Sequence, residues 1–170
     1  MYKIISIEGN LSSGKHLFLS KLRKKYSDDN NCIIIDDINI SDELTFSNKL
    51  KQLLDKYNLI KELTELNGVD KTYIINRTLD SECNVYTKLL YEQGRITEDE
   101  WNTYNRVYNL FDNKYEPISI IYVDRDIDGC LKYNDKQTLV DLQHCDALYQ
   151  EYLYDKQVAY VNEYFKKKSK

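Results

Sequence analysis

The residues best suited to chemistry stand near the start of the chain, where Gly9 is followed, after four residues, by Gly14-Lys15. This is the spacing of a phosphate-binding loop, in which backbone N–H groups and a helix N-terminus face a polyphosphate and the lysine neutralises its charge. A strand pattern precedes the loop and a helical pattern follows it, as such a loop requires. The candidate nucleotide-binding residues are therefore Gly9, Asn10, Ser12, Ser13, Gly14, Lys15 and His16.

His16 stands where a phosphate-binding loop usually has a Ser or Thr, whose hydroxyl binds Mg²⁺. A neutral imidazole is a poor partner for Mg²⁺, which prefers oxygen ligands. Two alternatives stay open: Ser12 or Ser13 coordinates the metal instead, or His16 contacts an anion at the start of the helix. The sequence therefore assigns no metal ligand.

The elements that must position this loop alternate between strand and helix. Short apolar runs rich in Ile and Val, the last of them weaker, predict strands over Lys3–Ile7, Cys32–Ile35, Thr72–Ile75, Ser119–Val123 and Gln157–Val161. Helical spacing predicts helices over residues 15–25, 42–66, 81–93, 97–111 and 136–154. This order predicts an α/β fold with a five-stranded parallel sheet and helices on both faces.

Composition limits the class of protein. The chain has 170 residues, 42% hydrophobic and 31% charged, which predicts a single soluble domain over residues 1–170. No apolar run reaches the roughly 20 residues of a membrane span, and a net charge of −4 argues against general nucleic-acid binding. The four scattered cysteines form no C-x-x-C pair, and no secretory signal is visible, so we expect reduced thiols and a cytoplasmic protein.

Four blocks in this order resemble the deoxynucleoside kinases, the group that contains deoxycytidine, deoxyguanosine and mitochondrial-type thymidine kinases. They are the loop from Ile7 to Lys15, Asn76-Arg77-Thr78-Leu79-Asp80-Ser81-Glu82, the stretch from Tyr86 to Gly94 with Thr97-Glu98-Asp99-Glu100-Trp101, and Val158-Ala159-Tyr160-Val161-Asn162-Glu163-Tyr164-Phe165. The third block, with its glycine and tryptophan at family spacing, is the most specific. The resemblance covers most of the chain and implies the P-loop nucleoside-kinase fold.

The resemblance implies transfer of the γ-phosphoryl group of ATP, with Mg²⁺, to a deoxynucleoside 5′-hydroxyl. Such catalysis consists mostly of positioning and charge neutralisation. The resemblance also implies a homodimer formed through helices, and the tyrosine-rich pair Ser81–Phe111 is the candidate surface, although its apolar positions serve equally well as core. Asn162, at the end of the last strand, is expected beside the adenine ring.

The catalytic residues implied by the resemblance are only partly kept. The family has a catalytic glutamate after its second strand, and here that corner reads Asp36-Asp37, with a solvated loop start as the alternative. The family arginine near the phosphoryl centre is kept as Arg77, whereas its neighbouring glutamate is replaced by Asn76. Glu82 aligns with a base-contacting aspartate, and an exposed residue in a first helical turn is the alternative interpretation.

The substrate-binding residues and the lid are altered further. Phe46 and Ser47 align with a Phe-Gln pair in which the glutamine pairs with the nucleobase, but serine is too short for that contact, and Phe46 is more typical of a core. The family places several arginines in the segment after the fourth strand, and here residues 124–136 hold one arginine and two lysines. Val140 aligns with a carboxylate that the family uses on the sugar.

These substitutions favour a kinase homologue with an eroded active site that acts through nucleotide or protein binding. Cys83 and Val140 replace polar family residues, His16 and Asn76 replace metal-site and catalytic ones, and phosphoryl transfer fails when charge neutralisation fails. The alternative is an active, divergent deoxynucleoside kinase that uses Lys15, Arg77 and one of the two aspartates. A nucleoside monophosphate kinase is a third, weaker interpretation.

Overall fold

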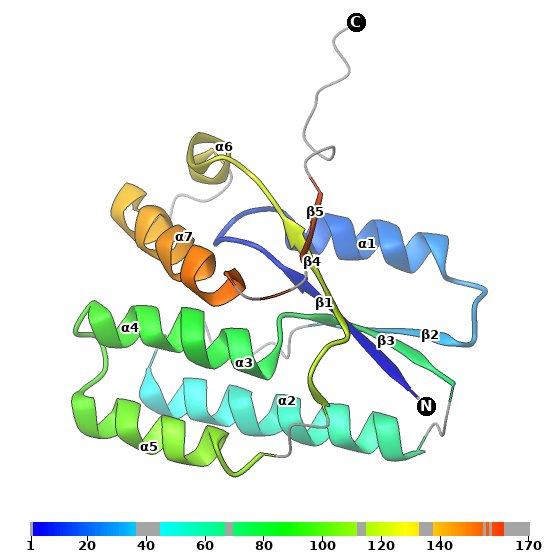
Figure 1. Ribbon diagram of the computed structural model, residues 1–170, viewed down its shortest axis with the longest axis horizontal. Coiled ribbons are helices and arrows are strands. Elements are labelled where there is room, and N and C mark those ends of the chain that lie inside the picture. The colour runs from blue at the N-terminus through cyan, green and yellow to red at the C-terminus, as the bar shows by residue number, and fades with distance from the viewer. Residues whose placement is uncertain are drawn as a thin grey trace, which may run out of the picture.

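The computed structural model describes residues 2–36, 45–66, 70–111, 115–132, 138–154, 156 and 158–161. Their strands form one parallel sheet in the order β2-β3-β1-β4-β5, which confirms the predicted fold class (Figure 1). The strands are β1 (Lys3–Glu8), β2 (Cys32–Ile35), β3 (Thr72–Asn76), β4 (Ser119–Val123) and β5 (Val158–Val161). The central strand β1 lies between β3 and β4, so its carboxyl end, where the loop of residues 9–16 (the P-loop) begins, is the point where ligands bind in such sheets.

Helices cover both faces of the sheet (Figure 1). Their bounds are α1 (Lys15–Lys25), α2 (Phe46–Leu66), α3 (Leu79–Ser81), the π-helix η1 (Glu82–Thr87), α4 (Lys88–Glu92), α5 (Glu98–Tyr108), α6 (Ile127–Leu131) and α7 (Leu139–Leu153). On one face, α1 packs Phe18 and Leu19 against the odd-numbered residue Ile7 of β1. The other face is covered by α2, η1, α5 and α7, and the even-numbered residues of β1, including Ser6 and Glu8, face these helices.

Three helices begin where a threonine hydroxyl caps them. Thr78, Thr97 and Thr138 each accept a hydrogen bond from the backbone N–H three residues on, and each of the three helices has a reciprocal capping box. The capping box at Thr97 was predicted and is confirmed. Helix α2 begins at Phe46, not near residue 42, because Thr45 Oγ1 accepts the Asn48 N–H at 3.3 Å; residues 42–44 lie outside the described part.

Other boundaries also differ from the prediction. The helix predicted over 81–93 begins at Leu79 and passes through η1, where the Lys88 N–H bonds the Cys83 carbonyl five residues back. The last helix begins at Leu139, not near residue 136. A short helix, α6, which was not predicted, occupies part of the segment after β4, capped by the Asp126 carboxylate. The predicted helix end at Asn67-Gly68 lies outside the described residues, whereas Gly94 ends α4 with a φ of 67°.

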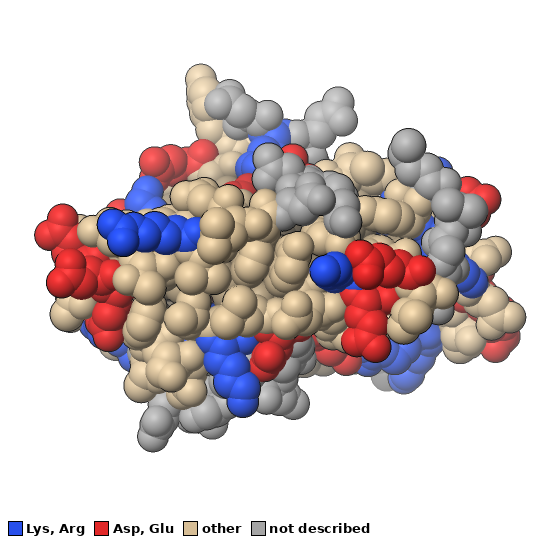
Figure 2. Space-filling view, turned by 90° about the horizontal axis from the view of Figure 1, so that it is seen from below, with Lys and Arg blue, Asp and Glu red and all other residues tan. Residues whose placement is uncertain are grey.

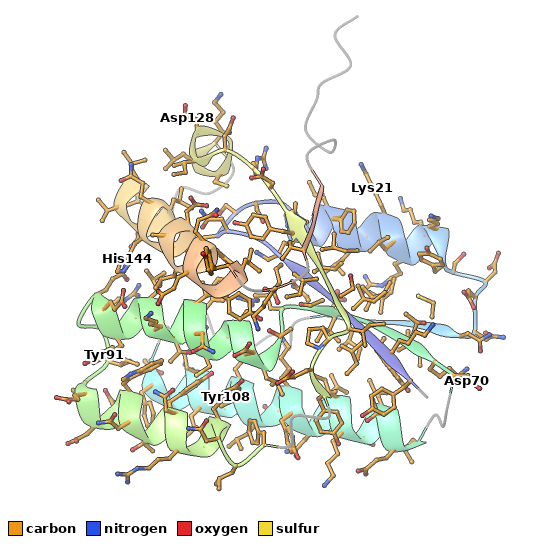
Figure 3. All side chains as sticks on the ribbon, in the orientation of Figure 1. Lys21, Asp70, Tyr91, Tyr108, Asp128 and His144 are labelled. Carbon is orange, nitrogen blue, oxygen red and sulfur yellow. The ribbon has the colours of Figure 1, made fainter. Side chains whose placement is uncertain are left out.

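The tyrosine-rich pair of helices contributes mainly to the core. Tyr86, Leu89, Leu90 and Tyr104 are all buried, and Trp101 stacks on the ring of Tyr91 at 5.5 Å between ring centroids. Figure 3 shows side chains filling the space between the sheet and its helices on both faces, with Tyr91 near the turn that joins α4 to α5. All four cysteines are free thiols. No helix among the described residues is long and apolar enough to cross a membrane.

Candidate active site

The backbone of the P-loop has the shape expected of an anion-binding turn. Ser12 and Gly14 are in the left-handed region, with φ values of 58° and 88°, and Gly14 leads directly into α1. Alternation of left- and right-handed residues turns successive N–H groups to one side, and the N-terminus of α1 adds a positive field. At Gly9, with φ of 153°, a Cβ would come within 2.8 Å of the Val123 carbonyl oxygen, so only glycine fits. The loop therefore has the backbone conformation that a phosphate cradle requires, and phosphate binding by its residues stays a prediction.

Lys15 lies against the loop from which it comes. Its Nζ donates to the carbonyl oxygens of Gly9 at 2.5 Å and Asn10 at 2.9 Å, and to the Tyr86 hydroxyl at 3.2 Å. These three acceptors match the three N–H donors of an ammonium group. In this structure the ammonium group that would neutralise a polyphosphate is therefore hydrogen-bonded to the protein itself.

Tyr86 and Tyr149 connect the P-loop to α7. The Tyr86 hydroxyl donates to the Gly9 carbonyl at 2.8 Å, and the Tyr149 hydroxyl lies 2.9 Å from both Tyr86 Oη and Glu8 Oε2. Burial raises the pKa of both hydroxyls well above the ordinary value for tyrosine, so each keeps its proton. A second link joins the same elements, because the Asn10 side-chain amide donates to the Leu142 carbonyl at 3.0 Å.

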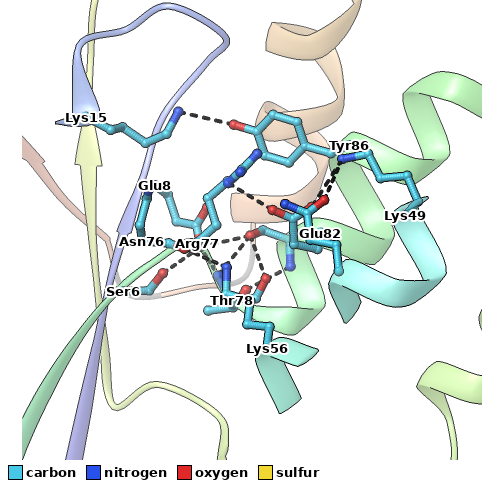
Figure 4. A network of polar contacts seen from close by, with 12 residues as sticks. Ser6, Glu8, Lys15, Lys49, Lys56, Asn76, Arg77, Thr78, Glu82 and Tyr86 are labelled. Carbon is cyan, nitrogen blue, oxygen red and sulfur yellow. Dashed lines mark hydrogen bonds and ion pairs between the residues drawn. The ribbon is translucent and has the colours of Figure 1, made fainter. Parts of the chain in front are cut away.

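Glu8, at the end of β1, is a buried carboxylate whose oxygens are surrounded by donors. Its Oε1 accepts from Ser6 Oγ at 2.6 Å, the Thr78 N–H at 2.8 Å and Ser81 Oγ at 2.9 Å, while Oε2 lies against Tyr149 (Figure 4). Such a carboxylate stabilises the junction of β1 with α3 and α7. Its hydrogen-bonding capacity is committed to the protein.

Arg77 and Glu82 form the second charged centre of the site. Arg77 follows β3 with a φ of 63°, a conformation that costs a residue with a Cβ about 1–2 kcal/mol. Its Nε lies 2.9 Å from Glu82 Oε1, and Lys49 Nζ lies 3.6 Å from Glu82 Oε2. Glu82 is 1% exposed, so the interpretation of this residue as an exposed first-turn position is wrong.

A second lysine of α2, Lys56, is also buried, at 2% exposure, and its Nζ donates to the Asn76 carbonyl at 2.6 Å. Figure 4 thus shows four basic side chains, Lys15, Lys49, Lys56 and Arg77, near two acidic ones, Glu8 and Glu82; Lys49 and Arg77 are paired with Glu82, whereas Lys56 and Lys15 donate to backbone carbonyls. A buried or partly buried cluster with excess positive charge at the carboxyl end of a parallel sheet is suited to an anion.

The structure places Asp36 away from this network. Its Oδ2 lies 2.6 Å from Arg23 Nη2 of α1, and the two side chains are 58% and 50% exposed. Asp37 and Asn162 lie outside the described residues. Phe46 packs against the hydrophobic core, which agrees with the interpretation of this residue as a core residue. Ser47 is exposed on the first turn of α2.

The remaining P-loop candidates have different roles. Ser12 supplies a left-handed residue of the loop, whereas the side chain of Asn10 is occupied by α7 and by the Leu11 N–H. Ser13 Oγ is buried and points toward Gly9, since a Cβ added there would meet it at 2.7 Å. His16 is exposed on the first turn of α1.

This donor set does not fit a resident Mg²⁺ site. His16 offers an exposed imidazole where a hydroxyl is needed, and Ser13 Oγ is directed into the protein. Within the described ranges, no group of three or more His, Cys, Asp and Glu side chains is arranged to hold a metal ion. Neither His16 nor Ser13 therefore replaces the missing ligand.

Sequence reasoning missed Glu8, Lys49, Lys56, Tyr86 and Tyr149 as site residues. For Glu8 the sequence did contain a signal, namely a charged residue in a strand that is buried on both faces. Such a residue needs hydrogen-bond donors inside the protein. Tyr149 lies 63 residues from Tyr86 in the chain, and nothing local indicates that their hydroxyls meet. The two lysines look like ordinary solvated residues of an amphipathic helix.

Comparison with known proteins agrees with this architecture. The family model described as deoxynucleoside kinase matches residues 5–167. The fold is similar to that of a solved structure described as deoxyadenosine kinase from M. mycoides with bound dATP, with 16% sequence identity, a TM-score of 0.64, and 94% of this chain and 90% of that chain covered. A search of curated proteins finds no match. The chain belongs to the deoxynucleoside kinase family.

Proposed function

We propose that this chain is a nucleotide-binding member of its family in which phosphoryl transfer to a deoxynucleoside is slow or lost. The observation that carries the proposal is the position of Asp36, the described candidate for the general base, which is ion-paired with Arg23 at the surface. A general base must reach the hydroxyl that it deprotonates. A carboxylate held by a surface guanidinium is poorly placed for that step.

Binding is supported by the parts that remain. The left-handed residues of the P-loop, the N-terminus of α1 and the cations Lys15 and Arg77 offer what a polyphosphate needs. The structurally similar deoxyadenosine kinase contains dATP according to its description. Adenine nucleotides are therefore the ligands to test first.

The test is equilibrium binding of ATP and dATP, measured calorimetrically with and without Mg²⁺. We expect binding to the wild type and an affinity lower by about 10-fold or more in Lys15→Ala, because a hydrogen bond to a charged group is lost. Lys24→Ala, which removes an exposed lysine from the last turn of α1, is the matched control and leaves the affinity unchanged. Equal affinities in wild type and Lys15→Ala, or no binding at all, contradict the proposal.

We also propose that the protein pairs with a second copy, as the family resemblance implies. Figure 2 shows the molecule from the side of α2 and α5, with an uncharged area bordered by both basic and acidic side chains. Leu110, directly after α5, is 82% exposed. Sedimentation equilibrium should give twice the chain mass of 20.3 kDa for the wild type and less association for Leu110→Glu; a monomeric wild type at high micromolar concentration would exclude pairing.

A further inference from the structure

Three basic side chains from three different elements converge on the ring of Tyr86. The distances to the ring centroid are 4.3 Å from Arg77 Cζ, 5.8 Å from Lys15 Nζ and 6.0 Å from Lys49 Nζ. The Arg77 guanidinium is close enough for a cation–π contact with this ring, whereas Lys15 lies at the hydroxyl end of the ring, 3.2 Å from Oη. Figure 4 shows Tyr86 between Lys15 on one side and Lys49 on the other. In this structure an aromatic ring stands among cations that would otherwise suit an anion.

The hydroxyl of the same residue is bonded to the P-loop. It donates to the Gly9 carbonyl at 2.8 Å and accepts from Lys15 Nζ at 3.2 Å, while Lys15 also reaches the Gly9 and Asn10 carbonyls. A phosphate that binds in the loop must take N–H donors of Lys15 away from these acceptors. The cost of breaking those contacts opposes phosphate binding.

We propose that Tyr86 is a positioning residue that holds Lys15 against the carbonyls of its own loop and thereby weakens the binding of polyphosphates. The identity of the ligand, a polyphosphate, rests on the proposed nucleotide binding. The restraint of Lys15 by Tyr86 is a property of the free protein and does not depend on that proposal.

Tyr149 keeps Tyr86 in place. Its hydroxyl lies 2.9 Å from Tyr86 Oη and 2.9 Å from the buried carboxylate of Glu8, and the two rings meet edge to face at 5.8 Å between centroids. Removing the Tyr149 hydroxyl should therefore loosen the same restraint less than removing that of Tyr86.

The first test measures the reactivity of Lys15 in the free protein. Brief acetylation at neutral pH, quantified by mass spectrometry and normalised to the exposed Lys24, reports how firmly Lys15 is held. We expect Tyr86→Phe to raise Lys15 acetylation about 2- to 10-fold, the range that corresponds to loss of one hydrogen bond. Tyr73→Phe is the matched control, because this buried hydroxyl also donates to one backbone carbonyl, that of Leu63, at 2.8 Å. Unchanged reactivity in Tyr86→Phe overturns the inference.

The second test titrates inorganic triphosphate into the same variants. Tyr86→Phe should bind triphosphate 2- to 10-fold more tightly than the wild type, although the melting temperature falls in both Tyr86→Phe and Tyr73→Phe. A purely structural role would lower stability and weaken binding together. If Tyr86→Phe does not fold, Tyr149→Phe is used in its place. We then expect a smaller rise in Lys15 acetylation, and no rise at all overturns the inference.

The two measurements separate the inference from the proposed function. Increased Lys15 acetylation without triphosphate binding to any variant supports the restraint and contradicts nucleotide binding. Triphosphate binding to the wild type, with equal or weaker binding to Tyr86→Phe, supports the proposed function and contradicts the role of Tyr86.

Discussion

At the scale of single residues, the chemistry of this protein depends on charges that are buried and paired. Glu82 compensates Arg77 and Lys49, and Glu8 is enclosed by hydroxyl and N–H donors. Removing one partner of a buried ion pair leaves the other charge without compensation, which costs far more than the net contribution of the pair. Glu82, which aligns with the base-contacting aspartate of the family, therefore has a structural role in this protein, whether or not it also contacts a nucleoside.

We expect Glu82→Gln to lower the free energy of unfolding by about 3–5 kcal/mol, because the buried Lys49 and the partly buried Arg77 lose their common carboxylate. Urea denaturation followed by circular dichroism measures the change. Glu65→Gln, an exposed position on α2, serves as the control and should change stability by less than about 0.5 kcal/mol. A Glu82→Gln variant as stable as this control would mean that the ion pairs are absent in solution.

His16 gives a second prediction at this scale. Because the imidazole is exposed and is a poor Mg²⁺ ligand, ATP binding to the wild type should change little when Mg²⁺ replaces EDTA. His16→Ser restores a hydroxyl at the position where the loop normally binds the metal, and should make ATP binding tighter with Mg²⁺ than without it. Strong Mg²⁺ dependence in the wild type would show that another ligand has taken over this task.

At the scale of elements, strands were easier to predict than the contacts of helices. All five strands were predicted to within one residue because strands buried on both faces read as continuous apolar runs. The helix starts at Phe46 and Leu139 were predicted a few residues too early, since the helical periodicity extends past the threonine that precedes each helix. The π-helix and the meeting of Tyr86 with Tyr149 depend on packing between distant segments, which no local pattern records.

The N-terminus of α7 supplies the prediction that belongs to this scale. Thr138→Ala removes the cap and should lower the free energy of unfolding by about 1 kcal/mol, whereas Thr138→Ser keeps the hydroxyl and most of the stability. Thermal melts of the three proteins provide the measurement. Equal melting temperatures for the Ala and Ser variants would contradict the capping role.

The partner of that cap, Asp141, makes the effect depend on pH. Burial raises the pKa of Asp141, but hydrogen bonds from Thr138 and Gln93 outweigh it and hold the pKa below its ordinary value. A lowered pKa stabilises the folded state above the pKa of the unfolded chain and loses that effect as pH falls through the folded value. The stability gap between wild type and Asp141→Asn should therefore be constant near neutral pH and shrink below about pH 4; a gap that widens in acid would refute it.

At the scale of the whole molecule, the parallel sheet brings the P-loop, the turn after β3 and the inner faces of α2 and α7 to one edge. The sequence was sufficient for this architecture and for the turn that joins β1 to α1, because glycine spacing and strand order are local signals. The sequence was not sufficient to predict where the charged side chains of the site lie. Lys15 held inward, Asp36 at the surface and buried lysines on α2 are results of tertiary packing.

The measurement that tests the central claim most directly is transfer of labelled γ-phosphate from ATP, with Mg²⁺, to each of the four deoxynucleosides, with wild type and Lys15→Ala compared at equal concentration. We expect transfer by the wild type to be absent or far slower than the roughly 1–100 s⁻¹ typical of kinases, with each of the four deoxynucleosides. Turnover by the wild type within that range that disappears in Lys15→Ala would contradict the proposed function and establish an active deoxynucleoside kinase.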